Sequence, residues 1–103
     1  MRGEVYRLRA PRDARGHDQS GPRFAVVVQS DALPLSTWLV VPTSTSARAA
    51  SFRPDMEIAG RATRVLAEQT AAVNTQRLGE CVGALTFDEQ RRVDAALRIV
   101  LEL

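Results

Sequence analysis

Two short apolar runs separated by a turn constrain the fold of this chain most. Residues 24–30 (FAVVVQS) form an unbroken run rich in β-branched side chains, which is typical of a well-buried strand. Residues 37–43 (TWLVVPT) form a second run of this kind, and residues 31–36 (DALPLS) turn the chain between them. We expect Pro42 to stop the second strand, because proline has no N–H to donate to a sheet ladder.

Weaker strand signals lie on both sides of this pair. One segment alternates apolar and polar side chains and two others are short and apolar; these predicted strands cover residues 3–10, 56–60 and 81–86. Met56 and Ile58 would share one face of the middle strand. Residues 64–74 (RVLAEQTAAVN) begin like a strand, but their Ala-rich middle is also compatible with a helix.

The C-terminal segment carries the clearest helix signal. Residues 86–89 (TFDE) fit a capping box, in which Thr and Glu satisfy each other's backbone N–H groups. Beyond it, apolar side chains recur with helical spacing at Val93, Leu97 and Val100. A helix is therefore predicted over residues 87–101.

This order of elements predicts a mainly β fold. Five or six short strands, two long loops (11–23 and 44–55) and a final helix follow one another without the strand–helix alternation of a parallel sheet. We expect a small antiparallel barrel with an added C-terminal helix, built as a single domain over residues 1–103. Because no apolar run approaches the ~18 residues that span a bilayer and no signal peptide is visible, a cytoplasmic location is expected.

Composition argues against several kinds of catalytic site. With one His and one Cys, a metal centre is not expected. The chain has no Lys for a phosphate-binding P-loop, and no G-x-S-x-G nucleophile elbow. Cys81 precedes the apolar VGAL and is expected to be a small core residue. His17 is interpreted as a solvated loop residue, with contact to a ligand as the alternative.

The basic residues are all arginine, 14 in number. This bias spans the chain, so it fits a GC-rich genome as well as a protein that binds phosphates or carboxylates. Residues 1–53 hold eight arginines and four acidic residues, a net +4, whereas residues 54–103 hold six and eight, a net −2. A basic N-terminal half is suited to nucleic acid or to an acidic peptide.

An arginine and a run of hydroxyl residues remain as a candidate site. Arg23 precedes the first apolar run, and residues 43–46 (TSTS) end the second. If these strands pair antiparallel, Arg23 and Ser44 lie at the same edge of the sheet and could converge on one phosphate. The alternatives are that Arg23 pairs with Asp13 or Asp18, and that the hydroxyl run is a solvated turn.

Five segments in a particular order carry a resemblance to a known family. They are RGEVY (2–6), GPRFAVVVQSD (21–31), VVPTSTS (40–46), LAEQTAAVNTQRLGECVGAL (66–85) and VDAALRIVLEL (93–103). The ordered set resembles the MazF/PemK toxin family over essentially the whole chain. The resemblance implies the toxin of a bacterial type II toxin–antitoxin system with an SH3-like barrel of the MazF/CcdB type. It also implies a homodimer, a MazE-like antitoxin and no cofactor.

The resemblance also implies roles for particular residues. Arg23 in GPRFAVV (21–27) matches the family's catalytic arginine, although Phe24 replaces the proline that usually follows it. Ser44 stands where the V-P-x-T pattern of the family has its catalytic threonine. The residues implied in RNA binding are Arg12, Arg15, His17, Gln19, Thr45, Arg48, Glu68 and Gln69.

The implied activity is that of an mRNA interferase, a metal-independent and sequence-specific endoribonuclease that cuts single-stranded RNA and inhibits translation and growth. Attack of a ribose 2′-hydroxyl on the adjacent phosphate gives 2′,3′-cyclic phosphate and 5′-hydroxyl ends. Arg23 would stabilise the phosphorane, and Ser44 would hold the phosphate or the 2′-oxygen. Two alternatives stay open: a CcdB-like gyrase-inhibiting toxin, against which the C-terminal RIVLEL (98–103) argues, and a non-catalytic member that binds RNA or antitoxin.

Overall fold

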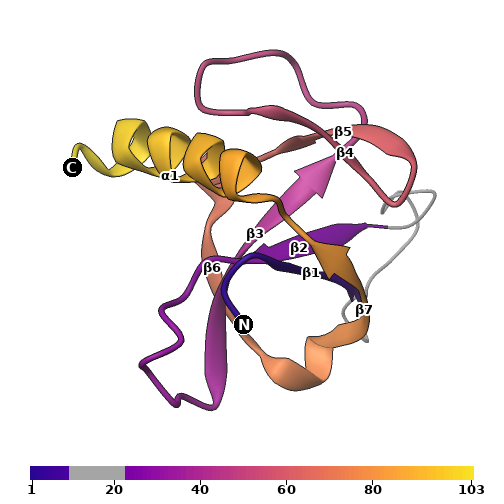
Figure 1. Cartoon of the computed structure of the whole chain (residues 1–103), viewed down its shortest axis with the longest axis vertical. Coiled ribbons are helices and arrows are strands. Elements are labelled where there is room, and N and C mark those ends of the chain that lie inside the picture. The colour runs from indigo at the N-terminus through magenta and orange to yellow at the C-terminus, as the bar shows by residue number, and fades with distance from the viewer. Residues whose placement is uncertain (10–22) are drawn as a thin grey trace.

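The computed structural model describes residues 1–9 and 23–103 of the chain. These residues form a seven-stranded sheet in which all the pairings are antiparallel, and the sheet curls into a half-barrel (Figure 1). The elements are β1 (Glu4–Leu8), β2 (Phe24–Val27), β3 (Thr37–Ser44), β4 (Asp55–Ile58), β5 (Arg61–Val65), a 3₁₀ turn η1 (Ala67–Gln69), β6 (Ala71–Asn74), a second 3₁₀ turn η2 (Thr75–Arg77), β7 (Leu78–Ala84) and the helix α1 (Phe87–Leu101). The expected mainly β fold with a C-terminal helix is confirmed.

Strand β2 lies at the centre of the fold and is buried on both faces. Phe24 and Val26 belong to one apolar cluster, and Ala25 and Val27 belong to a second cluster on the opposite face. The first cluster includes residues of β4, β5 and α1, and the second includes residues of β3 and β7. This double burial explains why the sequence of β2 is continuously apolar rather than alternating.

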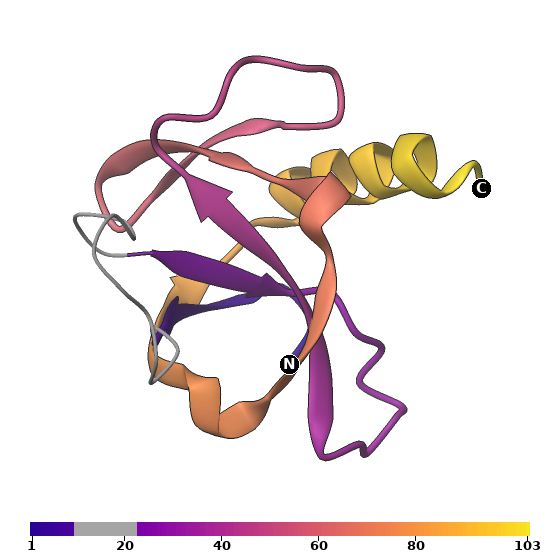
Figure 2. The same cartoon turned by 180° about the vertical axis from the view of Figure 1, so that it is seen from behind.

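Strand β3 continues through Pro42 to Ser44, so the expectation that Pro42 stops it is wrong. β6 pairs with β3 only as far as Val40, and β5 pairs with it only from Thr43 (Figure 2). Pro42 lies in the gap between these two partners, where its carbonyl accepts a hydrogen bond from Leu66 N at 2.9 Å. The backbone N and C=O of a strand residue point to the same side, so the missing N–H of Pro42 leaves no ladder bond unmade.

The segment that the sequence left ambiguous, residues 64–74, divides into three pieces. It completes β5, makes the short turn η1 and then forms β6, which pairs with the first half of β3. Ala67 therefore lies in a 3₁₀ turn, whereas Ala71 and Ala72 are in a strand, because pairing with β3 overrides their intrinsic preference. In β4, Met56 and Ile58 are both buried on one face, as the alternation predicted.

The helix α1 spans the predicted residues Phe87–Leu101. Its capping box is complete: Thr86 Oγ1 accepts from Glu89 N at 3.1 Å, and Glu89 Oε1 accepts from Thr86 N at 2.8 Å. Val93 is buried in the first apolar cluster and Leu97 packs against the same cluster. The helix therefore closes one face of the curled sheet with its predicted apolar side.

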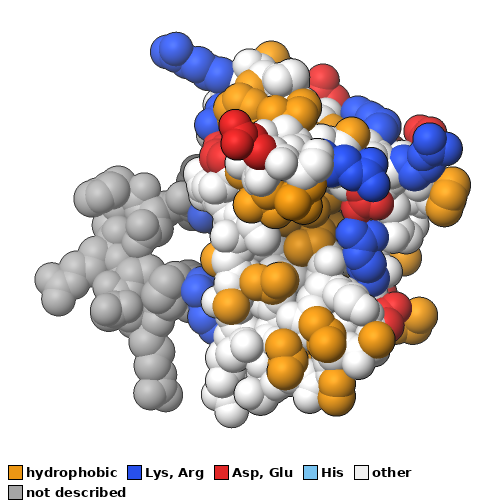
Figure 3. Space-filling model, turned by 90° about the vertical axis from the view of Figure 1, so that its left-hand side faces the viewer, with side chains coloured by type: hydrophobic (Ala, Val, Ile, Leu, Met, Phe, Trp, Pro, Cys, Tyr) orange, Lys and Arg blue, Asp and Glu red, His pale blue; other side chains and the backbone are white. Residues whose placement is uncertain are grey.

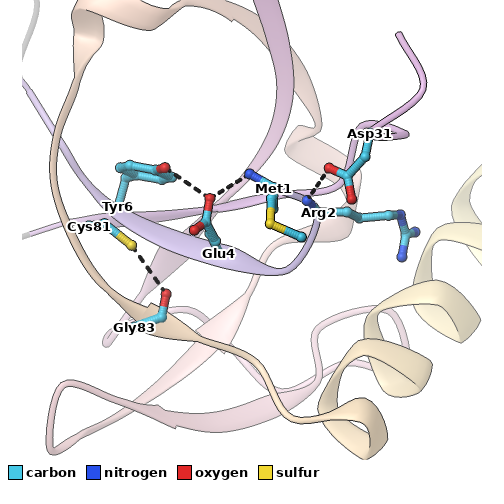
Figure 4. Close-up of polar contacts among 7 residues, drawn as sticks. All are labelled: Met1, Arg2, Glu4, Tyr6, Asp31, Cys81 and Gly83. Carbon is cyan, nitrogen blue, oxygen red and sulfur yellow. Dashed lines mark hydrogen bonds and ion pairs between the residues drawn. The ribbon is translucent and has the colours of Figure 1, made fainter. Parts of the chain in front are cut away.

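Cys81 is exposed, so the expectation that it is a core residue is wrong. It lies on β7, which ends the strand order, and its thiol points to the Gly83 carbonyl at 3.5 Å (Figure 4). Tyr6, its partner in the β1–β7 pairing, is half-buried and donates its hydroxyl to Glu4 Oε1 at 3.0 Å. Burial and this hydrogen bond raise the pKa of Tyr6 to about 12.

Candidate active site

Arg23 and Ser44 lie at neighbouring strand ends. β2 and β3 pair antiparallel as far as Ala25 opposite Pro42, and the same register continued two steps beyond this last pair would put Arg23, the residue before β2, opposite Ser44. The backbone supports this continuation, because Thr43 Oγ1 donates to the Phe24 carbonyl at 3.3 Å. The carbonyl of Arg23 accepts from Leu8 N at 2.9 Å, which holds the start of β2 against β1. Residues paired in this way project to the same face of a sheet.

The hydroxyl of Ser44 is held by its own turn. Ser44 Oγ accepts a hydrogen bond from Ser46 N at 3.2 Å and lies 3.3 Å from Ser46 Oγ. Such a serine turn restricts the χ1 angle of the side chain. This contact supplies part of the restraint that the methyl group of a threonine would give at the same position.

A second arginine, Arg64 on β5, faces Ser44 from the other side. The two residues are direct partners in the β3–β5 ladder, so their side chains share one face. Arg64 Nη1 donates to the Ala47 carbonyl at 2.7 Å, and Nε lies 2.9 Å from Asp55 Oδ1. Asp55 is in turn the direct partner of Arg64 in the β4–β5 ladder. Ser44, Arg64 and Asp55 thus form one row across the sheet, and the continued β2–β3 register extends this row towards Arg23.

The loop between β3 and β4, residues 45–54, is tied to η1 by an ion pair. Arg53 donates from Nε and Nη2 to Glu68 Oε2, at 2.9 and 2.6 Å, and from Nη1 to the Arg48 carbonyl at 3.2 Å. The hydrogen bonds from Arg53 lower the pKa of Glu68 below its usual value. Glu68, which the resemblance implied in RNA binding, is therefore already engaged within the fold.

In the described part of the chain, the other residues expected to bind RNA make no hydrogen bond to Arg23 or Ser44. Arg48 and Gln69 are exposed, on the 45–54 loop and in η1 respectively. Thr45 lines a cleft of about 480 Å³ between the β4–β5 hairpin and the start of α1, and Asp55 and Arg64 line the same cleft. The remaining four expected residues, Arg12, Arg15, His17 and Gln19, lie outside the described residues, as do Asp13 and Asp18, the alternative partners of Arg23.

Neither a cluster of potential metal ligands nor a membrane-spanning helix is found in the described part of the chain. Within residues 1–9 and 23–103, no three His, Cys, Asp or Glu side chains lie together as potential metal ligands. No helix in the described part of the chain has the length and apolar character that crossing a bilayer requires.

Sequence reasoning missed Arg53 and Arg64. Arg64 meets Ser44 through the β3–β5 pairing, and Arg53 meets Glu68 across 15 residues of chain. The sequence signal for Arg64 was a basic residue directly before the apolar run VLA (65–67), which is compatible with many solvated strand positions. Their roles depend on which strands are neighbours, and the sequence did not determine this.

A comparison of the sequence with known families decides the membership of the chain. The profile of the family described as PemK-like, MazF-like toxin of type II toxin–antitoxin system matches residues 1–101. The chain belongs to this PemK/MazF toxin family. A relative named "Putative toxin" from Mycobacterium tuberculosis (strain ATCC 25618 / H37Rv) is 40% identical over 104 residues, covering 100% of the chain and 98% of the relative.

Solved structures agree with the fold of this PemK/MazF toxin. An endoribonuclease in complex with its cognate antitoxin, from a mycobacterial species, superposes with a TM-score of 0.80 at 22% identity, covering 100% of this chain and 95% of that one. The Mycobacterium tuberculosis toxin MazF-mt6 gives 0.79 at 14% identity, with 97% of both chains covered. MazF from Deinococcus radiodurans gives 0.78 at 22% identity, covering 99% and 96%. At these identities the likeness shows a shared fold.

Proposed function

We propose that this PemK/MazF toxin is an endoribonuclease that cuts single-stranded RNA in a sequence-specific manner without a metal ion. The observation that carries the proposal is the row of residues at the ends of β2 and β3. Continued past its last pair, the β2–β3 register leads from Arg23 towards Ser44, whose hydroxyl accepts a hydrogen bond from the Ser46 N–H. This pairing supplies positive charge and a hydrogen-bond donor, the two properties that a phosphate in transesterification requires.

The proposed reaction proceeds by internal transesterification. The ribose 2′-oxygen attacks the adjacent phosphorus and loses its proton, and the bond from phosphorus to the 5′-oxygen breaks. The departing 5′-oxygen takes up a proton, which leaves a 2′,3′-cyclic phosphate and a 5′-hydroxyl. Arg23 stabilises the charge that develops on the equatorial oxygens, and donation of the final proton is the secondary role proposed for it.

Ser44 holds the attacked phosphate or aligns the 2′-oxygen, and Thr45 assists from the following position. Arg48 and Gln69 are exposed and add RNA contacts from the 45–54 loop and from η1. Glu68 contributes by holding that loop through Arg53. The proposed RNA contacts of Arg12, Arg15, His17 and Gln19 rest on the resemblance alone. No cofactor is required by this scheme.

Two protein partners belong to the proposal. As a member of a type II toxin family, the chain is proposed to bind a MazE-like antitoxin that covers the RNA-binding surface. It is also proposed to form a homodimer. Apolar side chains gather on the side from which the end of α1 projects (Figure 3), and Ile99, Leu101 and Leu103 there are 52, 56 and 85% exposed. With mRNA as the substrate, the site of action is the cytoplasm, where cleavage inhibits translation and growth.

The decisive experiment incubates the purified protein with a mixed single-stranded RNA in EDTA and maps the ends of the products. We expect 2′,3′-cyclic phosphate ends, and a loss of about 10²–10³-fold in cleavage rate for Arg23→Ala, because one preorganised donor to the phosphorane is removed. Arg98→Ala, which removes an arginine of the last turn of α1, is the matched control and retains activity. Cleavage that survives Arg23→Ala unchanged contradicts the site.

Expression in bacteria and RNA-binding measurements distinguish the nuclease from the two alternative functions, a gyrase-inhibiting toxin and a non-catalytic member of the family. Growth arrest with intact RNA and trapped gyrase–DNA complexes would indicate a gyrase-inhibiting toxin. Tight RNA binding without cleavage by the unaltered protein would indicate a non-catalytic member of the family.

A further inference from the structure

Arg64 is unlike the other arginine that holds the 45–54 loop. Both side chains donate to a carbonyl of this loop, Arg53 to Arg48 and Arg64 to Ala47. Arg53 also donates two hydrogen bonds to one oxygen of Glu68, whose side chain is only 26% exposed. The positive charge of Arg53 is thus compensated inside the fold.

The charge of Arg64 is compensated poorly. Its nearest carboxylate, Asp55, has a side chain that is 74% exposed, and exposed ion pairs of this kind contribute little energy. Arg64 Nε lies 2.9 Å from Asp55 Oδ1, but its N–H is not directed at that oxygen, and this buried nitrogen has no hydrogen-bond partner among the described residues. A guanidinium has five N–H donors, and Arg64 uses one of them on Ala47.

Arg64 lies next to Ser44, so its remaining N–H groups are close to any anion that Ser44 holds. Arg64 is the direct ladder partner of Ser44, and paired residues have Cβ atoms about 4.5–5.5 Å apart on a common face. Arg23, the residue before β2, is brought towards the same position from the other side of β3 when the β2–β3 register is continued past Ala25 and Pro42. An anion held by Ser44 therefore lies between two arginines carried by different strands.

We propose that Arg64 is a second phosphate-binding arginine of this site, which contacts an RNA phosphate while its Nη1 holds Ala47. The inference rests on the proposed function, because the phosphate is taken to be that of RNA at Ser44. A planar guanidinium can present two parallel N–H groups to two phosphate oxygens. The hydrogen bond to Ala47 then couples phosphate binding to the placement of the 45–54 loop, three residues beyond Ser44.

Substitution of Asp55 tests the proposal through a gain in RNA affinity, which loss of folding cannot produce. Its carboxylate lies beside Arg64 and repels an incoming phosphate. Replacing it with asparagine removes the negative charge while keeping a side chain of the same size. Asp55→Asn is therefore expected to strengthen RNA binding, whereas Arg64→Gln is expected to weaken it.

The experiment measures the dissociation constant of a non-cleavable 2′-O-methyl RNA over a range of salt concentrations. Arg64→Gln weakens binding about 5–30-fold, and the slope of log K against log salt flattens by about 0.7, the value for one lost contact to a single strand. Asp55→Asn tightens binding about 2–5-fold at low salt. Arg61→Gln is the matched control, because Arg61 is exposed on the same strand opposite Ile58, and it leaves affinity within about twofold.

Two results would overturn the proposal. One is an affinity of Arg64→Gln equal to that of Arg61→Gln. The other is weaker binding with an unchanged salt slope, which would mean that Arg64 acts only by holding the loop. A titration with inorganic phosphate, followed by NMR of the arginine Nε–H signals, separates this inference from the proposed function. If the protein binds no RNA but phosphate shifts the Arg64 signal more than that of Arg61, Arg64 binds phosphate and the proposed nuclease function is wrong. If RNA is cut but phosphate leaves the Arg64 signal unchanged, the nuclease function is supported and the phosphate-binding role of Arg64 is wrong.

Discussion

Arg53 and Glu68 are joined through a single carboxylate oxygen, which accepts from Nε at 2.9 Å and from Nη2 at 2.6 Å. The two residues are 15 positions apart, and their side chains are 24 and 26% exposed. Because Arg53 also donates to the Arg48 carbonyl, the pair fixes the 45–54 loop to η1. A residue implied in RNA binding by resemblance therefore positions a loop of the candidate site.

Removal of this carboxylate should destabilise the protein. Glu68→Ala leaves Arg53 half-buried without its partner, and we expect a loss of about 1–2 kcal/mol in the free energy of unfolding. Urea denaturation followed by circular dichroism measures this loss. Glu80→Ala is the control, since its pair with Arg7 is exposed and 3.5 Å long, and a change below about 0.5 kcal/mol is expected. Equal effects of the two substitutions would contradict the structural role of Glu68.

The contribution of Glu68 to the free energy of unfolding should depend on pH. Hydrogen bonds from Arg53 lower the pKa of Glu68 in the folded protein below its value of 4.5 in an unfolded chain. The unfolded state therefore binds the proton more tightly, so this stabilisation is fully present above pH 4.5 and is lost as the pH falls through the lowered pKa. The difference in unfolding free energy between the unaltered protein and Glu68→Gln should narrow over this range. A constant difference down to low pH would show that the charge of Glu68 is not involved.

Ser44 should be required for cleavage through its hydroxyl alone. Ser44→Ala is expected to lower the rate of RNA cleavage about 10²–10³-fold, the range for losing one preorganised donor. Ser44→Thr keeps the hydroxyl and adds a methyl group that restricts χ1, so activity within a few-fold of the original is expected.

Ser46→Ala is the control for this pair of substitutions. It removes the hydroxyl 3.3 Å from Ser44 Oγ but keeps the Ser46 N–H that holds it. Cleavage measured with a fluorescent RNA should change little. If Ser44→Ala and Ser46→Ala behaved alike, the hydroxyl of Ser44 would have no special role.

The capping box of α1 should contribute measurably to stability. Thr86→Ala removes the acceptor for Glu89 N and is expected to cost about 1 kcal/mol in the free energy of unfolding. Thr86→Ser restores the hydroxyl and most of the stability. Urea unfolding monitored at the helix band compares the three proteins, and an alanine variant as stable as the serine variant would contradict the cap.

Features that depend on nearby residues were predictable from the sequence. The capping box and the apolar spacing of α1 gave its bounds, and the alternation in β4 gave its buried face. The unbroken apolar run of β2 indicated a well-buried strand. In each case the period of the backbone decides which side chains face the core, so a short stretch of sequence contains the necessary information.

Features that depend on which segments become neighbours could not be predicted in this way. Pro42 remains inside β3 because its missing N–H falls in the gap between β5 and β6. Cys81 is exposed because β7 ends the strand order.

The candidate site likewise contains residues that the sequence suggested and residues that only the fold identified. Arg23 and the hydroxyl run were candidates from the sequence, on the condition that their two strands pair antiparallel, and the family resemblance singled out Ser44 from that run. Arg64 and Arg53 were not, because the β3–β5 pairing that joins Arg64 to Ser44 and the contact of Arg53 with Glu68 of η1 were not anticipated. Local sequence determined the helix α1 and the buried character of β2 and β4. The tertiary structure alone decided which charges meet, because ion pairs and ladder partners form between segments that only folding brings together.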